Sequence, residues 1–375
     1  RLVMTKDSDY VLVRGDFYTD GRGNGVYKSG SVSNVSLLTA GILELQGNFT
    51  QESNDTSNSS YSAYNFQTSG THRVLLSGDV LQQIKFTDQL SSLFNELEIL
   101  NDRENGVVWL SDYNATKLIA SGIKLSSMII SRKKFTLYDD FTIAGDLTVS
   151  GAVNLNGHSL TVEGDLIHSS GDLSINEGTL IIQGDYRIQT PTEVEDEYTF
   201  SLGRLVMTKD SDYVLVRGDF YTDGRGNGVY KSGSVSNVSL LTAGILELQG
   251  NFTQESNDTS NSSYSAYNFQ TSGTHKVLLS GDEVQTVSFA DYNASYFSEL
   301  ELTNSNKGVV FQSSVVVKVI FNHNRNKFTL KSINSVFADY DNDGIKDNLD
   351  AFPLDALETI DTDNDGIGNN ADLDD

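Results

Sequence analysis

Regularly spaced carboxylates are the residues of this chain with the clearest capacity for chemistry. The segment from Asp339 to Asp375 holds 12 Asp and one Glu against one Lys. Asp stands at positions 1, 3 and 5 of a loop with Gly at position 6, and the pattern starts again at Asp361. Alternate carboxylates in such a loop converge on one hard cation, while position 7 offers a backbone carbonyl. The sequence therefore predicts two calcium sites, with these ligands: Asp339, Asp341, Asp343, Ile345, Asp347 and Asp350 in the first loop, and Asp361, Asp363, Asp365, Ile367, Asn369 and Asp372 in the second.

The two loops differ from EF-hands. Position 12 is Asp rather than Glu, and the connector "NLDAFPLDALET" offers no pair of amphipathic helices. The segment instead resembles the thrombospondin type 3 repeats of bacterial exported proteins, in which D-x-D-x-D-G loops alternate with a D-x-F-P connector, here Asp350 to Pro353. The resemblance covers the C-terminal tail only, and it implies extracellular calcium binding by the Asp positions named above. A merely acidic linker is the alternative.

Overall composition narrows the possible partners. The net charge of −25 argues against nucleic acid and against anionic membrane surfaces, and it favours cations. The chain has no Cys, so disulfides and thiolate metal sites are excluded. No apolar run is long enough to span a membrane, and neither a signal peptide nor a natural chain start is recognisable, so we expect both termini to be cut.

The part of the chain before the two predicted calcium loops consists of sequence repeats. Residues 1–72 recur without change at 204–275, and weaker similarity continues beyond. A shorter period is clearest in "VNLNGHSLTVEGDL" at 153–166 against "LSINEGTLIIQGDY" at 173–186. Alternation of apolar residues with period two, broken by Asn and Gly, predicts short strands and turns. Equivalent apolar positions every 20 residues predict coils that stack on one another.

We therefore expect an all-β, parallel β-solenoid with loop insertions, followed by the irregular Asp-rich tail. Leu160 should lie beside Leu180 and Val162 beside Ile182, all facing inward. The polar stretch 51–65 should be an exposed loop. A pair of antiparallel β-sandwich domains is the alternative fold. The expected organisation is a first long repeat at 1–137, regular coils at 138–190, an acidic junction at 191–203, a second long repeat at 204–335 and the calcium-binding tail at 336–375.

An Arg-Gly-Asp tripeptide occurs twice, at Arg14 and at Arg217. The residue before Gly-Asp varies along the chain whereas Gly-Asp recurs, so we interpret Gly-Asp as a corner of the coil and not as an integrin signal. Gly tolerates the backbone conformations of a corner, and Asp or Asn can bond nearby backbone there.

Catalysis finds little support in the sequence, and we expect no enzyme. The five His show no metal-ligand spacing, and the cluster Arg132, Lys133 and Lys134 is typical of a solvated turn. Parallel β-helix enzymes that cut polysaccharides nevertheless exist, so that fold alone leaves this alternative open.

The coils, for example "NLNGHSLTVEGDL", resemble those of filamentous-haemagglutinin-type surface proteins. Together the features predict a calcium-stabilised segment of a large exported bacterial surface protein, extracellular or at the cell surface, with a structural or adhesive role. The alternatives are a surface-layer or extracellular filament subunit and a polysaccharide-degrading β-helix enzyme. The expected partners are calcium ions, further copies in a fibre or lattice, and surface glycans.

Overall fold

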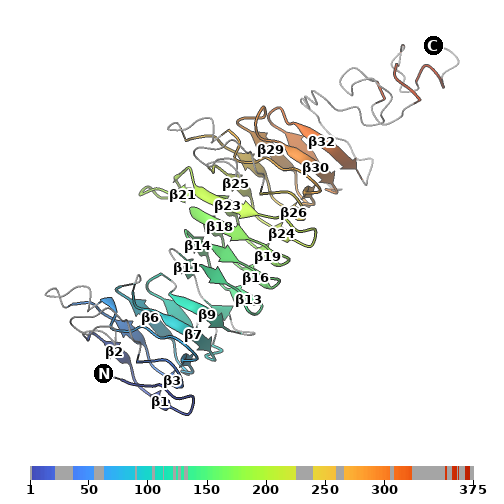
Figure 1. The fold of residues 1–375 in the computed structure, drawn as a ribbon. Coiled ribbons are helices and arrows are strands. Elements are labelled where there is room, and N and C mark those ends of the chain that lie inside the picture. The colour runs from blue at the N-terminus through green and yellow to red at the C-terminus, as the bar shows by residue number, and fades with distance from the viewer. Residues whose placement is uncertain are drawn as a thin grey trace, which may run out of the picture.

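A computed structural model describes the following residues: 2–21, 37–54, 63–88, 91–103, 106–112, 114–120, 124–125, 128–130, 134–224, 240–258, 266–304, 308–322, 351–352, 357–360, 362 and 368–371. Within these ranges all regular elements are strands. The strands of successive coils pair in parallel, and they form an elongated stack along which the chain advances from one end to the other (Figure 1). This arrangement is consistent with the predicted β-solenoid. Antiparallel sandwich domains are excluded, because only one short pair is antiparallel among the described strands.

Three faces make up each coil. Face 1 carries two sheets along the stack. The first contains β1 (Tyr10–Val13), β3 (Ile42–Leu45), β5 (Arg73–Leu76), β7 (Phe94–Ile99) and β9 (Ala115–Ile119). The second contains β10 (Lys124–Leu125), β13 (Phe141–Ile143), β16 (Ser159–Val162), β19 (Thr179–Ile182), β24 (Tyr213–Val216), β26 (Ile245–Leu248), β28 (Lys276–Leu279), β30 (Phe297–Leu302) and β32 (Val317–Asn322).

Face 2 follows the same order. Its first sheet contains β2 (Phe17–Thr19), β4 (Phe49–Gln51), β6 (Gln82–Phe86) and β8 (Val107–Trp109). Its second contains β11 (Met128–Ile130), β14 (Leu147–Val149), β17 (Leu166–His168), β20 (Tyr186–Ile188), β25 (Phe220–Thr222), β27 (Phe252–Gln254), β29 (Gln285–Phe289) and β31 (Val309–Phe311). Face 3 has β12 (Phe135–Thr136), β15 (Val153–Asn154), β18 (Ser170–Ser174) and β23 (Leu202–Val206), and single bridges such as Met4 to Leu38 continue it.

The predicted register of the regular coils is confirmed. Leu160 pairs with Leu180 and Val162 with Ile182, and all four side chains are fully buried. Alternation within each short strand sends one row of side chains inward, so that equivalent residues of successive coils form columns along the axis. The face 1 column continues from Leu180 through Val214, Leu246, Val277 and Leu300.

Aromatic residues fill the core of both long repeats. Phe252 contacts Phe220, Phe269, Phe289 and Phe297, with ring centroids 4.8 to 5.7 Å apart. The equivalent cluster of the first repeat is centred on Phe49. The buried apolar residues form one cluster from Met4 to Val317, so a single core runs through the described coils.

The acidic junction does not interrupt this core. Thr190–Pro191 (β21) and Tyr198–Thr199 (β22) form a small antiparallel hairpin that projects from the stack. β23 begins at Leu202 and pairs with β18, so the coils resume at the last residues of the expected 191–203 junction.

The expected exposed loop at 51–65 is wrong at both of its ends. Gln51 belongs to β4 and is fully buried, and Asn65 is buried as well. The Gln51 side chain donates a hydrogen bond to the Glu52 carbonyl and accepts one from the Asp88 amide. This polar side chain therefore makes hydrogen bonds inside the protein instead of facing solvent. Residues 55–62 lie outside the described part of the chain.

Candidate calcium tail and coil corners

The predicted calcium ligands lie almost entirely outside the described residues. Asn369 is the exception; the other ligands of both loops are not among the residues whose structure can be stated. The part of the tail that is described lies beyond the β32 end of the stack (Figure 1). Over the described ranges no group of three acidic or His side chains is placed to hold a metal ion, which leaves the two predicted loops untested.

Asn369 makes hydrogen bonds back to the start of the second loop. Its side-chain oxygen accepts a hydrogen bond from the Thr362 amide at 3.0 Å, and its Nδ2 donates to the Thr362 hydroxyl at 2.7 Å. Its backbone amide donates to the Ile360 carbonyl at 2.9 Å. These contacts bring loop positions 2 and 9 together. They also engage the amide oxygen that was predicted to bind the cation, although that oxygen retains a second lone pair.

Glu358 is a carboxylate that the sequence pattern did not single out. It is buried, and it accepts a hydrogen bond from the Asn370 amide at 2.9 Å. A Cβ at position 368 would lie 2.1 Å from its Oε2, so Gly368 permits this approach. Glu358 could have been noticed in the sequence, since it is the one Glu of the tail.

The predicted ligands of both loops are carboxylate, amide and carbonyl oxygens, and hard oxygen ligands of this kind fit Ca²⁺.

The Gly-Asp corners form a ladder along the stack. The Oδ1 of Asp146 accepts the Asp165 amide at 2.9 Å, that of Asp165 accepts the Asp185 amide at 2.7 Å, and that of Asp185 accepts the Asp219 amide at 2.8 Å. Asp219 in turn accepts the Asn251 amide at 2.8 Å. The structural interpretation of Gly-Asp is thus confirmed, with the difference that each carboxylate bonds the next coil instead of its own.

Both Arg-Gly-Asp tripeptides belong to this ladder. Asp16 accepts the Asn48 amide at 2.8 Å, and that hydrogen bond lowers the pKa of its carboxyl. Asp219 has the equivalent bond to Asn251 and accepts a further one from Tyr221. Arg14 and Arg217 are exposed.

The expected reason for glycine at these corners is wrong. None of Gly47, Gly218 and Gly250 is among the glycines with positive φ. A Cβ on Gly218 would instead lie 2.5 Å from the backbone of Gly184, and one on Gly250 would lie 2.2 Å from the Gly218 carbonyl oxygen. Close approach between coils, and not an unusual backbone angle, requires glycine here.

Arg187 binds the β21–β22 hairpin to the stack. Its guanidinium lies 3.8 Å from the Tyr221 ring centroid and 4.6 Å from that of Tyr198, and it pairs with Asp185 at 2.7 Å. Two cation–π contacts and an ion pair on a mostly buried side chain hold the hairpin to face 2.

Three of the four described His side chains, those of His72, His168 and His275, are buried, whereas His158 is partly exposed. His72 and His275 are buried, and each Nδ1 lies 2.9 Å from a carbonyl, of Ala40 and Ala243 respectively. His168 is buried between Tyr186 and the Gly171 carbonyl. Burial lowers the pKa of His168 and of His275 to about 4, so both are neutral at pH 7. His323, Arg132 and Lys133 lie outside the described residues.

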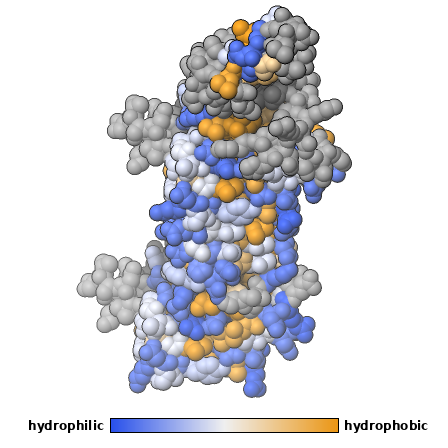
Figure 2. All heavy atoms as spheres, turned by 90° about the vertical axis from the view of Figure 1, so that its right-hand side faces the viewer, coloured by the Kyte–Doolittle hydropathy of each residue, from blue (hydrophilic) through white to orange (hydrophobic). Residues whose placement is uncertain are grey.

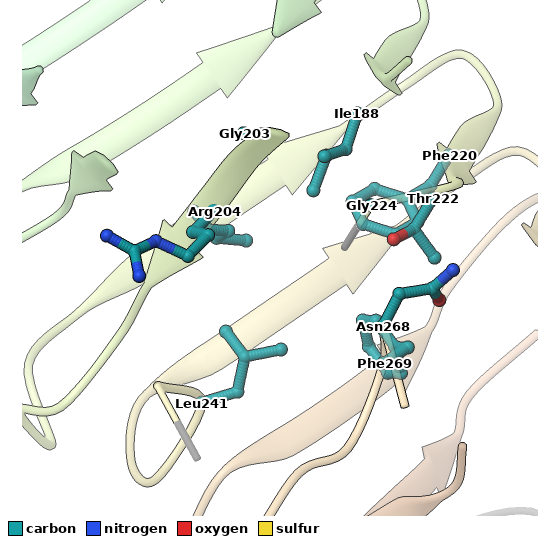
Figure 3. A pocket seen from close by; sticks show the side chains of 10 residues that line it. Ile188, Gly203, Arg204, Phe220, Thr222, Gly224, Leu241, Asn268 and Phe269 are labelled. Atoms are coloured by element: carbon teal, nitrogen blue, oxygen red, sulfur yellow. The ribbon is translucent and has the colours of Figure 1, made fainter. Parts of the chain in front are cut away.

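A small cavity lies where the regular coils meet the second long repeat. Figure 3 shows its lining, with Ile188, Arg204, Thr222 and Asn268 around it. Its volume of about 10 Å³ is close to what one water molecule needs. It is far too small for a sugar ring.

The face of the stack drawn in Figure 2 is mainly polar. Figure 2 shows one side of the stack as hydrophilic, with small scattered hydrophobic spots. Outward carboxylates on face 1 are paired within the surface: Arg73 with Glu98 at 2.8 Å, and Lys276 with Glu301 at 2.8 Å. The described elements include no helix suited to crossing a bilayer.

Comparison of the chain with protein-family models, with curated proteins and with solved structures finds no match. Function is therefore inferred from the residues and their geometry.

Proposed function

We propose that this chain is a calcium-binding structural segment of an exported bacterial surface protein, in which stacked β-coils act as a rigid spacer and the Asp-rich tail binds Ca²⁺. The observation that carries the proposal is the tandem Asp-x-Asp-x-Asp-Gly pattern, starting at Asp339 and at Asp361, on the C-terminal side of the coils. Asp343 and Asp365 occupy position 5 of the two loops.

The repeat supports a spacer or adhesive role. A unique catalytic centre gains nothing from duplication without change, whereas a spacer or a multivalent binder gains length or valency. The cavity near Asn268 is too small for a sugar, which disfavours it as a polysaccharide-cleaving site. The acidic surface favours an extracellular setting rich in divalent cations.

Calorimetric calcium titration tests the proposal. The whole chain should bind two or more ions in the range typical of extracellular modules, roughly 10⁻⁴ to 10⁻³ M. The double variant Asp343→Ala and Asp365→Ala should lose this binding, because one central ligand is removed from each loop. Asp79→Ala is the matched control, since Asp79 lies in an exposed turn of the coils. Calcium binding that survives in the double variant, or is lost in the control, would refute the assignment.

A further inference from the structure

The ends of three successive face 2 strands place two carboxylates close together, away from both ends of the stack. Gln189 follows β20, Asp223 follows β25 and Glu255 follows β27, and these strands pair in that order. The Asp223 amide donates to the Ile188 carbonyl at 3.0 Å. The Glu255 amide donates to the Thr222 carbonyl at 2.9 Å. The three side chains thus belong to consecutive coils, where the regular coils meet the second long repeat.

Asn257 bridges the two carboxylates. Its Nδ2 lies 3.0 Å from Oδ2 of Asp223 and 3.0 Å from Oε2 of Glu255, so these two oxygens are no farther apart than twice that distance. The Asn257 backbone amide donates to Oδ1 of Asp223 at 3.0 Å. From the preceding regular coil, the Gln189 side-chain amide donates to the same Oε2 of Glu255 at 3.0 Å. All four hydrogen bonds come from amide N–H groups, which carry no charge.

The surroundings make two negative charges costly at this place. Asp223 is fully buried and Glu255 is partly buried. Over the described part of the chain, neither carboxylate forms an ion pair with Lys or Arg. Two other charged groups act on them: the buried Asp258 on Asp223, and Arg187 on Glu255, although Arg187 already pairs with Asp185 at 2.7 Å. Burial is the main cause that raises the pKa of Asp223 and of Glu255, and neighbouring carboxylates raise both further.

We propose that Asp223 and Glu255 form a proton-sensitive clamp, in which one proton taken up by the pair strengthens the junction between the regular coils and the second long repeat. With both groups ionised, like charges in a poorly hydrated site oppose the stacking of the three coils. One proton removes this repulsion. Gln189 and Asn257 both reach Oε2 of Glu255, so Oε1 can carry the proton while both hydrogen bonds remain.

The direction of the pH response follows from linkage. In the folded chain both carboxyls hold their protons to higher pH than in the unfolded chain, where Asp and Glu ionise near pH 4. The stabilisation by the proton is therefore fully present below the unfolded values and is lost as the pH rises through the folded values. The clamp is weak in neutral solution and strong in mildly acidic solution.

Glu255→Gln imitates the protonated pair, because the Gln oxygen can accept both hydrogen bonds now made to Oε2. This variant should hold the junction tightly at every pH. Asn257→Asp does the reverse, since it replaces the bridging amide with a further carboxylate, and it should weaken the junction at neutral pH and recover in acid. Asp282→Asn is the matched control: it also removes one negative charge, but from an exposed corner of the same long repeat.

Hydrogen–deuterium exchange of the whole chain in chelator measures the junction locally, after correction for the intrinsic exchange rate at each pH. Between pH 7.5 and pH 5, protection at 220–224 and 252–257 should rise by about threefold or more in the wild type and in Asp282→Asn, with little change at 159–166. In Glu255→Gln protection should already be high at pH 7.5 and stay level. A Glu255→Gln profile that follows the wild type, a loss of protection in this variant at neutral pH, or an equal rise at 159–166 would overturn the proposal. Chelator keeps the result separate from the calorimetric test of calcium binding.

Discussion

The environment of an individual residue in this chain depends more on the coils stacked above and below it than on the neighbouring residues in the sequence. Gly15 and Gly218 occupy the same position of an identical sequence. A Cβ on Gly218 would lie 2.5 Å from Gly184, whereas one on Gly15 would meet nothing within 4 Å. The local chain is the same, so the constraint on glycine comes from stacking alone.

The matched pair Gly15→Ala and Gly218→Ala separates stacking from local conformation. We expect Gly218→Ala to lower the free energy of unfolding by about 1–3 kcal/mol, because the coils must move apart. Gly15→Ala should change it by less than about 0.5 kcal/mol. Urea denaturation at low protein concentration measures both. Equal effects at the two positions would show that the corner itself, and not the neighbouring coil, requires glycine.

Buried neutral His residues give the fold a defined pH response. Burial lowers the pKa of His275 to about 4, against about 6.5 in an unfolded chain. The unfolded state therefore binds the proton first, and the stability associated with the neutral ring is present above pH 6.5 and is lost as the pH falls toward 4. The shift corresponds to about 3 kcal/mol.

Comparison of His275→Met with the wild type isolates this effect from that of the many carboxylates. Between pH 7 and pH 4 the wild type should lose about 3 kcal/mol of unfolding free energy relative to the variant. Chemical denaturation at a series of pH values provides the measurement. Parallel pH profiles for the two proteins would mean that His275 is not held neutral by burial.

At the scale of elements, the 20-residue coils could be predicted from the sequence because each strand alternates strictly. Leu160 and Leu180 stand at equivalent positions of matching stretches, and one register alone buries both. The internal role of Gln51, Gln82 and Gln285 could not be predicted in this way. Gln82 is fully buried and bonds the Leu45 and Gly47 carbonyls and the Gly78 amide. Such hydrogen bonds depend on which coil lies next to the Gln residue. The sequence around a polar residue does not reveal that neighbour.

The β21–β22 hairpin offers an element-scale prediction. Arg187→Met should release the hairpin, because it removes both cation–π contacts and the pairing with Asp185. Cleavage by a Glu-specific protease at Glu193, Glu195 and Glu197 should then become faster, while the melting temperature changes by a few degrees at most. Arg187→Lys should restore protection only in part, since an ammonium cannot stack as a planar guanidinium does. Unchanged cleavage in Arg187→Met would show that Arg187 does not hold the hairpin.

At the scale of the whole molecule, the sequence contains two parts for which we expect different sources of stability. Apolar columns and backbone pairing hold the described coils together through residue 322. The tail has few apolar side chains and many carboxylates, so like charges oppose its compaction, and under the proposed function a bound cation would offset this repulsion. Composition and spacing predict the tail's ligands. The arrangement of those proposed ligands in space is not predictable from spacing, since in such sites it depends on the ion that binds.

Hydrogen–deuterium exchange of the whole chain, with calcium and with chelator, tests this division most directly. Calcium should slow exchange at 339–372 by tenfold or more and leave the coils from β1 to β32 unchanged. The double variant Asp343→Ala and Asp365→Ala should exchange as rapidly with calcium as without it. Tail exchange that is indifferent to calcium, or coils that lose their protection in chelator, would contradict the account of a metal-independent solenoid followed by a calcium-ordered tail.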